Sequence, residues 1–250
     1  MFRKLVLAAA LCATASFATW DKFPVLENHK GEMAIGTGFV WQGDSRPTQL
    51  TPYLGSRFTV LPNLELAVLL PYYVNLSMNN DNGLTNPELM ARYQFLPFVN
   101  VFLEALVPIS HTYNCYNVWV FNFGAQYSQN FGIVDFGAEL GFSMNTKESS
   151  DFSPPYRLNF GAEADFKLNI PLTPFIGADA LMLLGRITED GENDGKNLTG
   201  KTAVYPYIGL KYAITPNVTV QATAKTAFGH EELLGSDTPI MADLKVKMAF

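Results

Sequence analysis

The sequence predicts an all-β fold: a single transmembrane antiparallel β-barrel of about 12 strands, with short periplasmic turns and longer extracellular loops. Three observations carry the prediction: a secretion leader, alternation of apolar and polar residues along the chain, and aromatic residues sorted by strand end. The 250 residues are 48% hydrophobic, 13% aromatic and only 16% charged. This composition excludes a disordered chain and a basic nucleic-acid binder. A helical membrane protein is excluded too, because no run of about 18 apolar residues follows the leader.

The first segment has the features of a secretory signal peptide. Arg3 and Lys4 form a positive region, Leu5–Ala15 an apolar region, and Ser16-Phe17-Ala18 a cleavage site of small residues. Leu11 before Cys12 is unlike a lipid-attachment signal, so we expect cleavage after Ala18. The predicted division is a signal peptide at 1–18, a short periplasmic segment at 19–29 and the transmembrane β-barrel at 30–250.

Alternation with a period of two runs through the rest of the chain. In the last segment, every second residue from Ile240 to Phe250 is apolar, while the other face carries Asp243, Lys245 and Lys247. Each such segment reaches the roughly 9–11 residues that a tilted strand needs to cross a bilayer. The predicted strands are 30–42, 49–60, 64–76, 87–96, 99–110, 117–129, 132–146, 155–168, 172–186, 201–213, 218–228 and 239–250.

The connections between these strands alternate in length. One set of connections is tight, and the other set is mostly longer and polar. This alternation is typical of outer-membrane barrels. The tight turns are predicted at 61–63, 96–98, 130–131, 169–171 and 214–217, and the longer loops at 43–48, 77–86, 111–116, 147–154, 187–200 and 229–238. Pro71, Pro108 and Pro206 oppose regular strands, since proline removes a ladder donor.

Aromatic residues on the apolar faces fall into two groups. At the short-turn ends lie Phe58, Phe95, Tyr127, Phe166, Tyr212 and Phe250, and at the long-loop ends lie Trp41, Tyr72, Trp119, Tyr156 and Phe228. Two belts that bracket an aliphatic band are typical of the two interfaces of a membrane.

Two stretches resemble known families. The C-terminal residues Leu244, Val246, Met248 and Phe250 resemble the signal by which bacterial outer-membrane barrels are passed to their insertion machinery. The stretches TPYLGSRFTVLPNLELAVLLPYY and NPELMARYQFLPFVNVFLEALVPIS resemble the outer-membrane transporter family named for the MetA-pathway of phenol degradation. The resemblance implies a barrel in the bacterial outer membrane and uptake of aromatic compounds, and it assigns no ligand residue.

Charged residues of the opposite parity are expected inside the barrel, since a base facing lipid at the midplane costs about 2–4 kcal/mol. They are Glu32, Arg57, Glu65, Glu88, Arg92, Glu104, Asp135, Glu139, Arg157, Glu163, Asp165, Lys167, Asp179, Lys211, Lys225, Asp243, Lys245 and Lys247. They could select a solute in a pore or brace a narrow barrel by ion pairs. Arg57 with Glu65, and Arg92 with Glu104, are the expected cross-strand pairs.

The expected function is that of a passive channel or transporter for small molecules, hydrophobic or aromatic ones included. The alternatives are a closed structural or surface-interaction barrel and, less favoured, an enzyme like the outer-membrane phospholipases. The three histidines, His29, His111 and His230, form no recognisable serine site. The acidic loop 190–195 imitates a calcium loop, but Lys201 stands at its closing position. We expect no cofactor, metal or nucleic acid; the expected partners are the lipid bilayer, the insertion machinery and a small solute.

Overall fold

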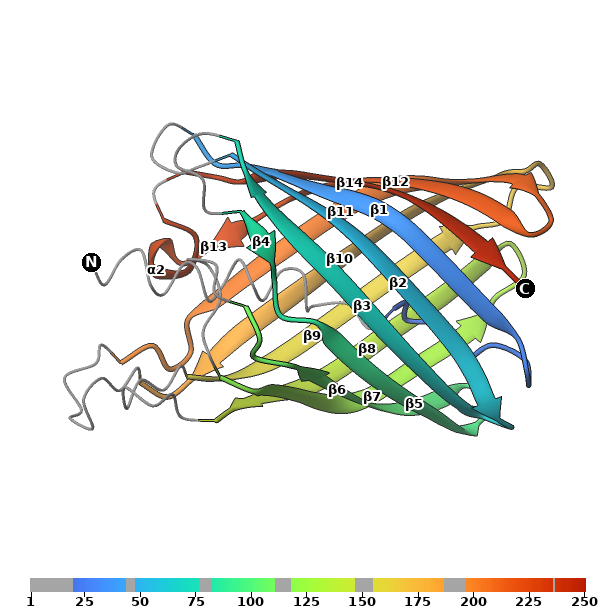
Figure 1. The fold of residues 1–250 in the computed structure, drawn as a ribbon, viewed down its shortest axis with the longest axis horizontal. Helices are drawn as coiled ribbons and strands as arrows, with labels where there is room; N and C mark the ends of the chain where they lie inside the picture. Colours follow the sequence, from blue (N-terminus) through green and yellow to red (C-terminus); the bar gives the residue numbers. More distant parts are fainter. Residues whose placement is uncertain are drawn as a thin grey trace.

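The fold is a single closed β-barrel. Its strands pair side by side around a central lumen and are tilted relative to the barrel axis (Figure 1). The computed structural model describes residues 20–43, 48–76, 82–110, 118–146, 155–186, 197–235 and 237–250. The predicted signal peptide at 1–18 and the acidic loop at 190–195 lie outside these residues, as does His111. In the part of the chain that is described, no helix has the length and apolar character to cross a membrane.

Twelve long strands form the wall, in close agreement with the predicted ranges. They are β1 (Gly31–Trp41), β2 (Gln49–Leu61), β3 (Leu64–Asn75), β5 (Glu88–Leu96), β6 (Val99–Leu106), β7 (Val120–Asn130), β8 (Val134–Asn145), β9 (Tyr156–Phe166), β10 (Leu172–Leu184), β11 (Thr202–Thr215), β12 (Val218–Thr226) and β14 (Ile240–Ala249). The longer connections carry three short elements: β4 (Gly83–Leu84), β13 (Phe228–Gly229) and the helix α2 (Glu231–Leu234).

Every long strand pairs antiparallel with the next one along the chain, and β1 closes the barrel against β14. The closing register places Glu32 opposite Ala249 and Trp41 opposite Ile240. Beyond it, Gly31 and Phe250 exchange two backbone hydrogen bonds of 2.9 and 3.0 Å. The C-terminus therefore lies at the end of the barrel that carries the tight turns, and the strand ends that lead into the longer loops lie at the other end (Figure 1).

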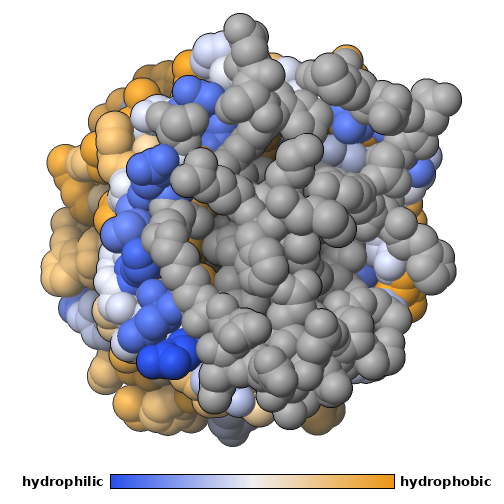
Figure 2. Space-filling model, turned by 90° about the vertical axis from the view of Figure 1, so that its left-hand side faces the viewer, coloured by the Kyte–Doolittle hydropathy of each residue, from blue (hydrophilic) through white to orange (hydrophobic). Residues whose placement is uncertain are grey.

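The outer surface is apolar, as expected of a wall that faces lipid. Figure 2 looks onto the long-loop end, where hydrophobic residues lie around the circumference and hydrophilic residues form an arc inside it. At the long-loop belt all five predicted aromatic residues are exposed. At the short-turn belt Phe95, Tyr127, Tyr212 and Phe250 are exposed, whereas Phe166 is half-buried and Phe58 is half-buried against its stacking partner Phe250.

The three prolines are accommodated where ladders are interrupted. Pro206 lies on β11 between the part that pairs with β12, which begins at Tyr207, and the part that pairs with β13. Pro71 lies on β3 beyond the last residue that pairs with β5. The strand β6 ends at Leu106, two residues before Pro108, so the predicted strand 99–110 is too long at its outer end.

Candidate functional site

The inner wall is polar and buried along much of its length. Its side chains come from many strands: Arg57 and Thr59 (β2), Glu65 (β3), Glu88 and Arg92 (β5), Asn100 and Glu104 (β6), Asn122 and Gln126 (β7), Glu139 (β8), Asn159 and Asp165 (β9), and Asp179 (β10). Because side chains alternate across a strand, the lipid-facing stripe forces these groups inward. This wall holds eight of the 18 charges expected inside the barrel.

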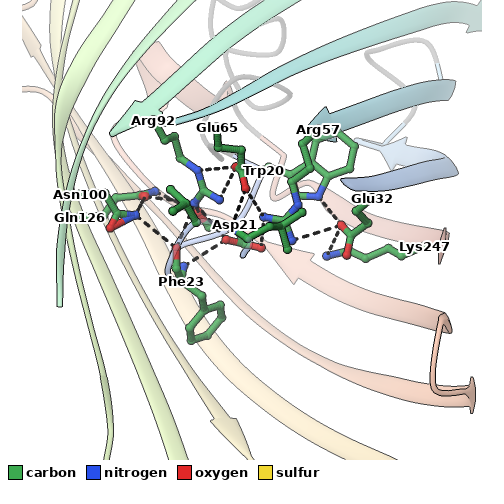
Figure 3. Close-up of polar contacts among 12 residues, drawn as sticks. Trp20, Asp21, Phe23, Glu32, Arg57, Glu65, Arg92, Asn100, Gln126 and Lys247 are labelled. Atoms are coloured by element: carbon green, nitrogen blue, oxygen red, sulfur yellow. Dashed lines mark hydrogen bonds and ion pairs between the residues drawn. The ribbon is translucent and has the colours of Figure 1, made fainter. Parts of the chain in front are cut away.

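A segment that precedes the wall also lies in the lumen. Residues 20–29, which we call the N-terminal segment, run from the start of β1 back into the barrel, where Trp20, Asp21 and Phe23 meet side chains of several strands (Figure 3). Residues 20–29, which the sequence predicts as a short periplasmic segment, thus lie against the inner wall of the barrel. Buried opposite charges on the wall draw Asp21 and Lys22 inward.

Asp21 lies between two arginines of the wall. Its Oδ2 is 2.8 Å from Nη1 of Arg57, and its Oδ1 is 3.1 Å from Nη1 of Arg92. Burial alone would raise the pKa of Asp21, but the two guanidinium groups and Lys247 hold that pKa well below its usual range. The carboxylate is therefore a firmly ionised anchor.

Lys22 reaches the opposite wall. Its Nζ lies 2.9 Å from Oδ1 of Asp179 and donates to the hydroxyl of Tyr207 at 3.3 Å. Burial alone would lower the pKa of Lys22, but Asp179, and then Glu139, Tyr207 and Glu163, raise it well above its ordinary value. The segment thus spans the lumen by one negative and one positive contact.

The wall also binds the main chain of the segment. The amides of Val25 and Leu26 donate to Gln94 and Glu65, at 3.0 and 3.1 Å. The carbonyl oxygens of Asp21, Phe23 and Leu26 accept hydrogen bonds from wall side chains. The donors are Arg92, Gln126, Asn100 and Thr59.

Glycines of the inner wall make room for the segment. A Cβ on Gly55 would lie 2.7 Å from the indole of Trp20, and one on Gly161 would lie 2.3 Å from Cε of Lys22. A Cβ on Gly137 would lie 2.6 Å from the carbonyl oxygen of Lys22. All three contacts are too close for an ordinary side chain, so the wall is recessed where the segment lies.

The two expected ion pairs have different outcomes. Arg57 and Glu65 do meet, at 3.7 Å. Arg92 does not pair with Glu104 as expected: its Nη2 lies 2.6 Å from Oε1 of Glu65, which stands directly opposite on β3. On β6 the residue opposite Arg92 is Phe102, and Glu104 accepts instead from Asn122 at 2.6 Å.

The other predicted lumen charges lie on the same inner face. Lys211 contacts Glu163 and Asp165, at 2.9 and 2.5 Å, and Lys225 contacts Asp179 at 2.7 Å. Glu139 accepts from Gln126 at 2.9 Å. Glu88 is buried, and Arg157 and Lys245 are half-buried. Sequence reasoning missed Asp21 and Lys22, which belong to no strand pattern or motif. It also missed the role of the recessed glycines, which lie on predicted strands but carry no signal of what they face.

Near the longer loops, the side of the lumen formed by β10, β11 and β14 has another character. A cluster of buried apolar residues, which we call the outer cluster, joins β10, β11, β14, the loops and α2. Its members are Leu181, Leu183, Leu198, Ala203, Tyr205, Ala227, Leu233, Leu234 and Met241. The loop that bears α2 is tied down by Gln42, whose side chain donates to the carbonyl oxygens of Leu234 and Asp237.

The other residues that the sequence singled out lie apart from the inner wall. His29 ends the N-terminal segment, its amide bonded to Thr59, and Nε2 of His230 lies 3.3 Å from Nζ of Lys201. In the described ranges, no three His, Cys, Asp or Glu side chains are grouped so as to hold a metal ion. The C-terminal residues Leu244, Val246, Met248 and Phe250 all lie exposed on the lipid face.

Comparison with known proteins supports the fold. No family model and no curated protein matches the sequence. Among solved structures, an outer membrane channel from Pseudomonas putida has a TM-score of 0.69 at 12% identity, over 93% of this chain and 99% of that one. The NanC porin has a TM-score of 0.59 at 11% identity, over 86% and 98%. The CymD monoaromatic hydrocarbon channel has a TM-score of 0.51 at 10% identity, over 90% of this chain and 89% of that one. At these identities the likeness shows one thing: the chain has the fold of bacterial outer-membrane β-barrels.

Proposed function

We propose that this protein is a passive channel for small molecules in the bacterial outer membrane, closed by its N-terminal segment. The observation that carries the proposal is the presence of a separable stretch of chain inside the lumen. The segment is joined to the wall only at β1 and is otherwise held by hydrogen bonds and ion pairs. Such contacts can be exchanged, whereas a wall built only of strands offers no part that can leave.

Burial of the wall charges determines what opening requires. Arg57, Arg92 and Asp179 are at most 5% exposed with the segment in place, so water or a solute must replace its charged groups when it withdraws. Twelve strands enclose more space than the eight whose lumen side chains alone can fill. Withdrawal of the segment would therefore leave a polar passage at the short-turn end.

The solved structures of similar fold support this proposal by analogy. Two of them are described as channels and one as a porin. The CymD structure and the resemblance to the phenol-degradation family both suggest aromatic solutes, and we include these among the small molecules that could pass. The proposal assigns no catalytic step to the chain.

We also propose how the protein reaches this state. Residues 1–18 act as a cleavable signal peptide, and the insertion machinery of the outer membrane recognises the terminal strand through Phe250. The exposure of Phe250 at the short-turn belt, stacked 6.5 Å from Phe58, supports this role. Deletion of Phe250 should lower the amount of inserted protein without changing the fold of what is inserted.

Current through single molecules in a planar bilayer tests the channel. The wild-type protein should conduct rarely, and the double variant Asp21→Ala/Lys22→Ala should conduct far more often, because both charged anchors of the segment are removed. Glu27→Ala is the matched control, since Glu27 is exposed and in the same segment. A double variant that stays as silent as the wild type would contradict the proposal.

The alternative is a closed barrel whose ion pairs only brace the wall. The density of buried charge pairs around Arg92 and Asp179 favours this second function. In that case the double variant would lose stability in detergent and gain no current. The two measurements on one variant therefore separate the channel from the brace.

A further inference from the structure

We infer that the inner wall is a binding site for the main chain of short peptides, and that short peptides are solutes which compete with the N-terminal segment for it. The inference rests on the proposed channel, because a solute must be able to replace the segment. It adds a substrate class that neither the fold nor the resemblance to an aromatic transporter supplies.

Wall side chains bind both kinds of main-chain group. On the acceptor side, Oε1 of Gln94 lies 3.0 Å from the amide of Val25, and Oε2 of Glu65 lies 3.1 Å from the amide of Leu26. Two consecutive amides are therefore bound by two different strands. Neither contact depends on the side chains of Val25 or Leu26, so another sequence could make them.

On the donor side, one arginine binds two carbonyl groups. Nη1 of Arg92 donates to the carbonyl oxygens of Asp21 and Phe23 at 3.0 and 3.1 Å. Three further donors complete the set. Gln126 donates to Asp21 at 3.0 Å, Asn100 to Phe23 at 3.3 Å, and Thr59 to Leu26 at 3.0 Å.

Burial makes this set of wall groups selective. Arg92, Gln126, Asn100 and Thr59 are between 0% and 2% exposed. A buried polar group that loses its partner is destabilised, so a replacement must supply carbonyl and amide groups in alternation. A hydrocarbon offers neither, and an inorganic ion could meet only the arginines. An extended peptide offers both at the right spacing.

The segment shows the conformation that the site accepts. Pro24 disfavours helix at Phe23 and holds the chain extended at that point. At one end of the segment, charges face opposite walls, with Asp21 on Arg57 and Lys22 on Asp179. A peptide that carries a carboxylate and an ammonium group near its end would repeat both contacts.

Channel block by synthetic peptides tests the inference. The protein is the full-length Asp21→Ala/Lys22→Ala variant, and the probe is a peptide with the sequence of residues 20–28. This peptide should block the current in a concentration-dependent manner. A peptide N-methylated at the positions of Val25 and Leu26 should block about tenfold less well, because it lacks two amide donors. Polyethylene glycol of equal mass is the control for simple obstruction.

The outcomes separate the inference from the proposed function. A variant without current contradicts the channel itself. A variant that conducts but is blocked equally by both peptides, or by neither, overturns the peptide site and leaves the channel standing. Should the variant fail to assemble, the wild-type barrel with Trp41→Phe and Trp119→Phe keeps Trp20 as reporter. A peptide that lacks tryptophan should then shift Trp20 emission toward that of a solvated indole, and no shift at saturation overturns the inference.

Discussion

The two halves of the lumen are filled by different means. Near the tight turns, the N-terminal segment is held by ion pairs and hydrogen bonds to wall groups such as Arg92 and Asp179. Near the longer loops, the outer cluster packs Leu233 and Leu234 of α2 against apolar residues of the wall. The first filling is polar. The second is apolar and lies on the side of β10, β11 and β14, whereas the wall on the side of β6 to β9 stays polar toward the longer loops, where Glu104, Asn122, Ser143 and Asn159 form a hydrogen-bonded network.

This difference indicates which half can open. Apolar packing is lost only when side chains separate and water enters, whereas each polar contact of the segment can be exchanged for water or solute one at a time. The segment is also continuous with β1, which begins at the short-turn end. Under the proposed function, the N-terminal segment is therefore the expected gate, and the outer cluster is expected to stay packed.

The largest expected effect comes from breaking the polar half at its centre. Arg92→Met leaves Glu65, which is 1% exposed, without its partner at 2.6 Å and also removes a contact of Asp21. Loss of one member of a buried pair costs about 3–5 kcal/mol. Urea unfolding in detergent should show this loss of unfolding free energy.

The control for that variant is Lys167→Met. Lys167 pairs with Asp135 but is 54% exposed, and an exposed pair contributes about 0–1 kcal/mol. Equal losses of unfolding free energy in the two variants would mean that burial does not strengthen the ion pairs of the lumen. Those pairs would then stabilise the barrel no more than an ion pair at the surface does.

A smaller loss is expected in the apolar half. Leu233→Ala removes a side chain that is 2% exposed from the outer cluster. A Leu→Ala change in a core costs about 2–5 kcal/mol, and we expect the lower end because a loop can collapse into the space. Leu76→Ala, at an exposed position of the same end, is the control. Current through the barrel should stay unchanged in both, and an opened channel in Leu233→Ala would move the gate to this half.

The sequence predicted the wall well, because lipid enforces the pattern. A strand that faces hydrocarbon must alternate, so strands, belts and inward charges could be located without the structure. Glu163, Asp179, Lys211 and Lys225 could be placed inside by parity alone. The prolines marked real interruptions of the ladders, as Pro206 shows between β12 and β13.

The filling of the lumen could not be predicted in the same way. Trp20, Asp21 and Lys22 belong to no repeat, and their partners are fixed only when the barrel closes. Arg92 was assigned to Glu104 across a hairpin, but the register at the bulge between Gln94 and Leu96 sets Phe102 opposite Arg92. Glu65 lies directly opposite Arg92 on β3, the other neighbouring strand, and forms the ion pair with it.

A third effect concerns the segment alone. Gly161→Leu places a side chain where Cε of Lys22 lies and should push the segment out of the lumen. We expect open-channel events about tenfold more often, which corresponds to about 1.4 kcal/mol of lost retention. Ala162→Leu adds a side chain to the opposite, lipid-facing side of β9 and should change nothing. Identical currents in the two variants would show that the recess at Gly161 does not hold the segment.

The smallest expected effect is that of pH on closure. The charged groups around Asp21 are Arg57, Arg92, Lys247, Glu32 and Glu65, and those around Lys22 are Asp179, Glu139, Glu163 and Tyr207. Because the pKa of Asp21 is lowered by its cationic neighbours, despite burial, its contribution is full above 3.8, the ordinary value, and is lost as pH falls below it. Because the pKa of Lys22 is raised, its contribution is full below 10.5 and is lost at higher pH.

Both anchors therefore hold across the range between these limits. Single-channel recordings should show the same low open probability from about pH 5 to pH 9, and opening should become frequent only below about pH 4. The variant Asp21→Asn removes the titrating carboxylate and should open more often at pH 7, with a flatter response to acid. An opening transition near pH 6 or 7 in the wild type would mean that neither Asp21 nor Lys22 controls closure, and that another group of the lumen releases the segment.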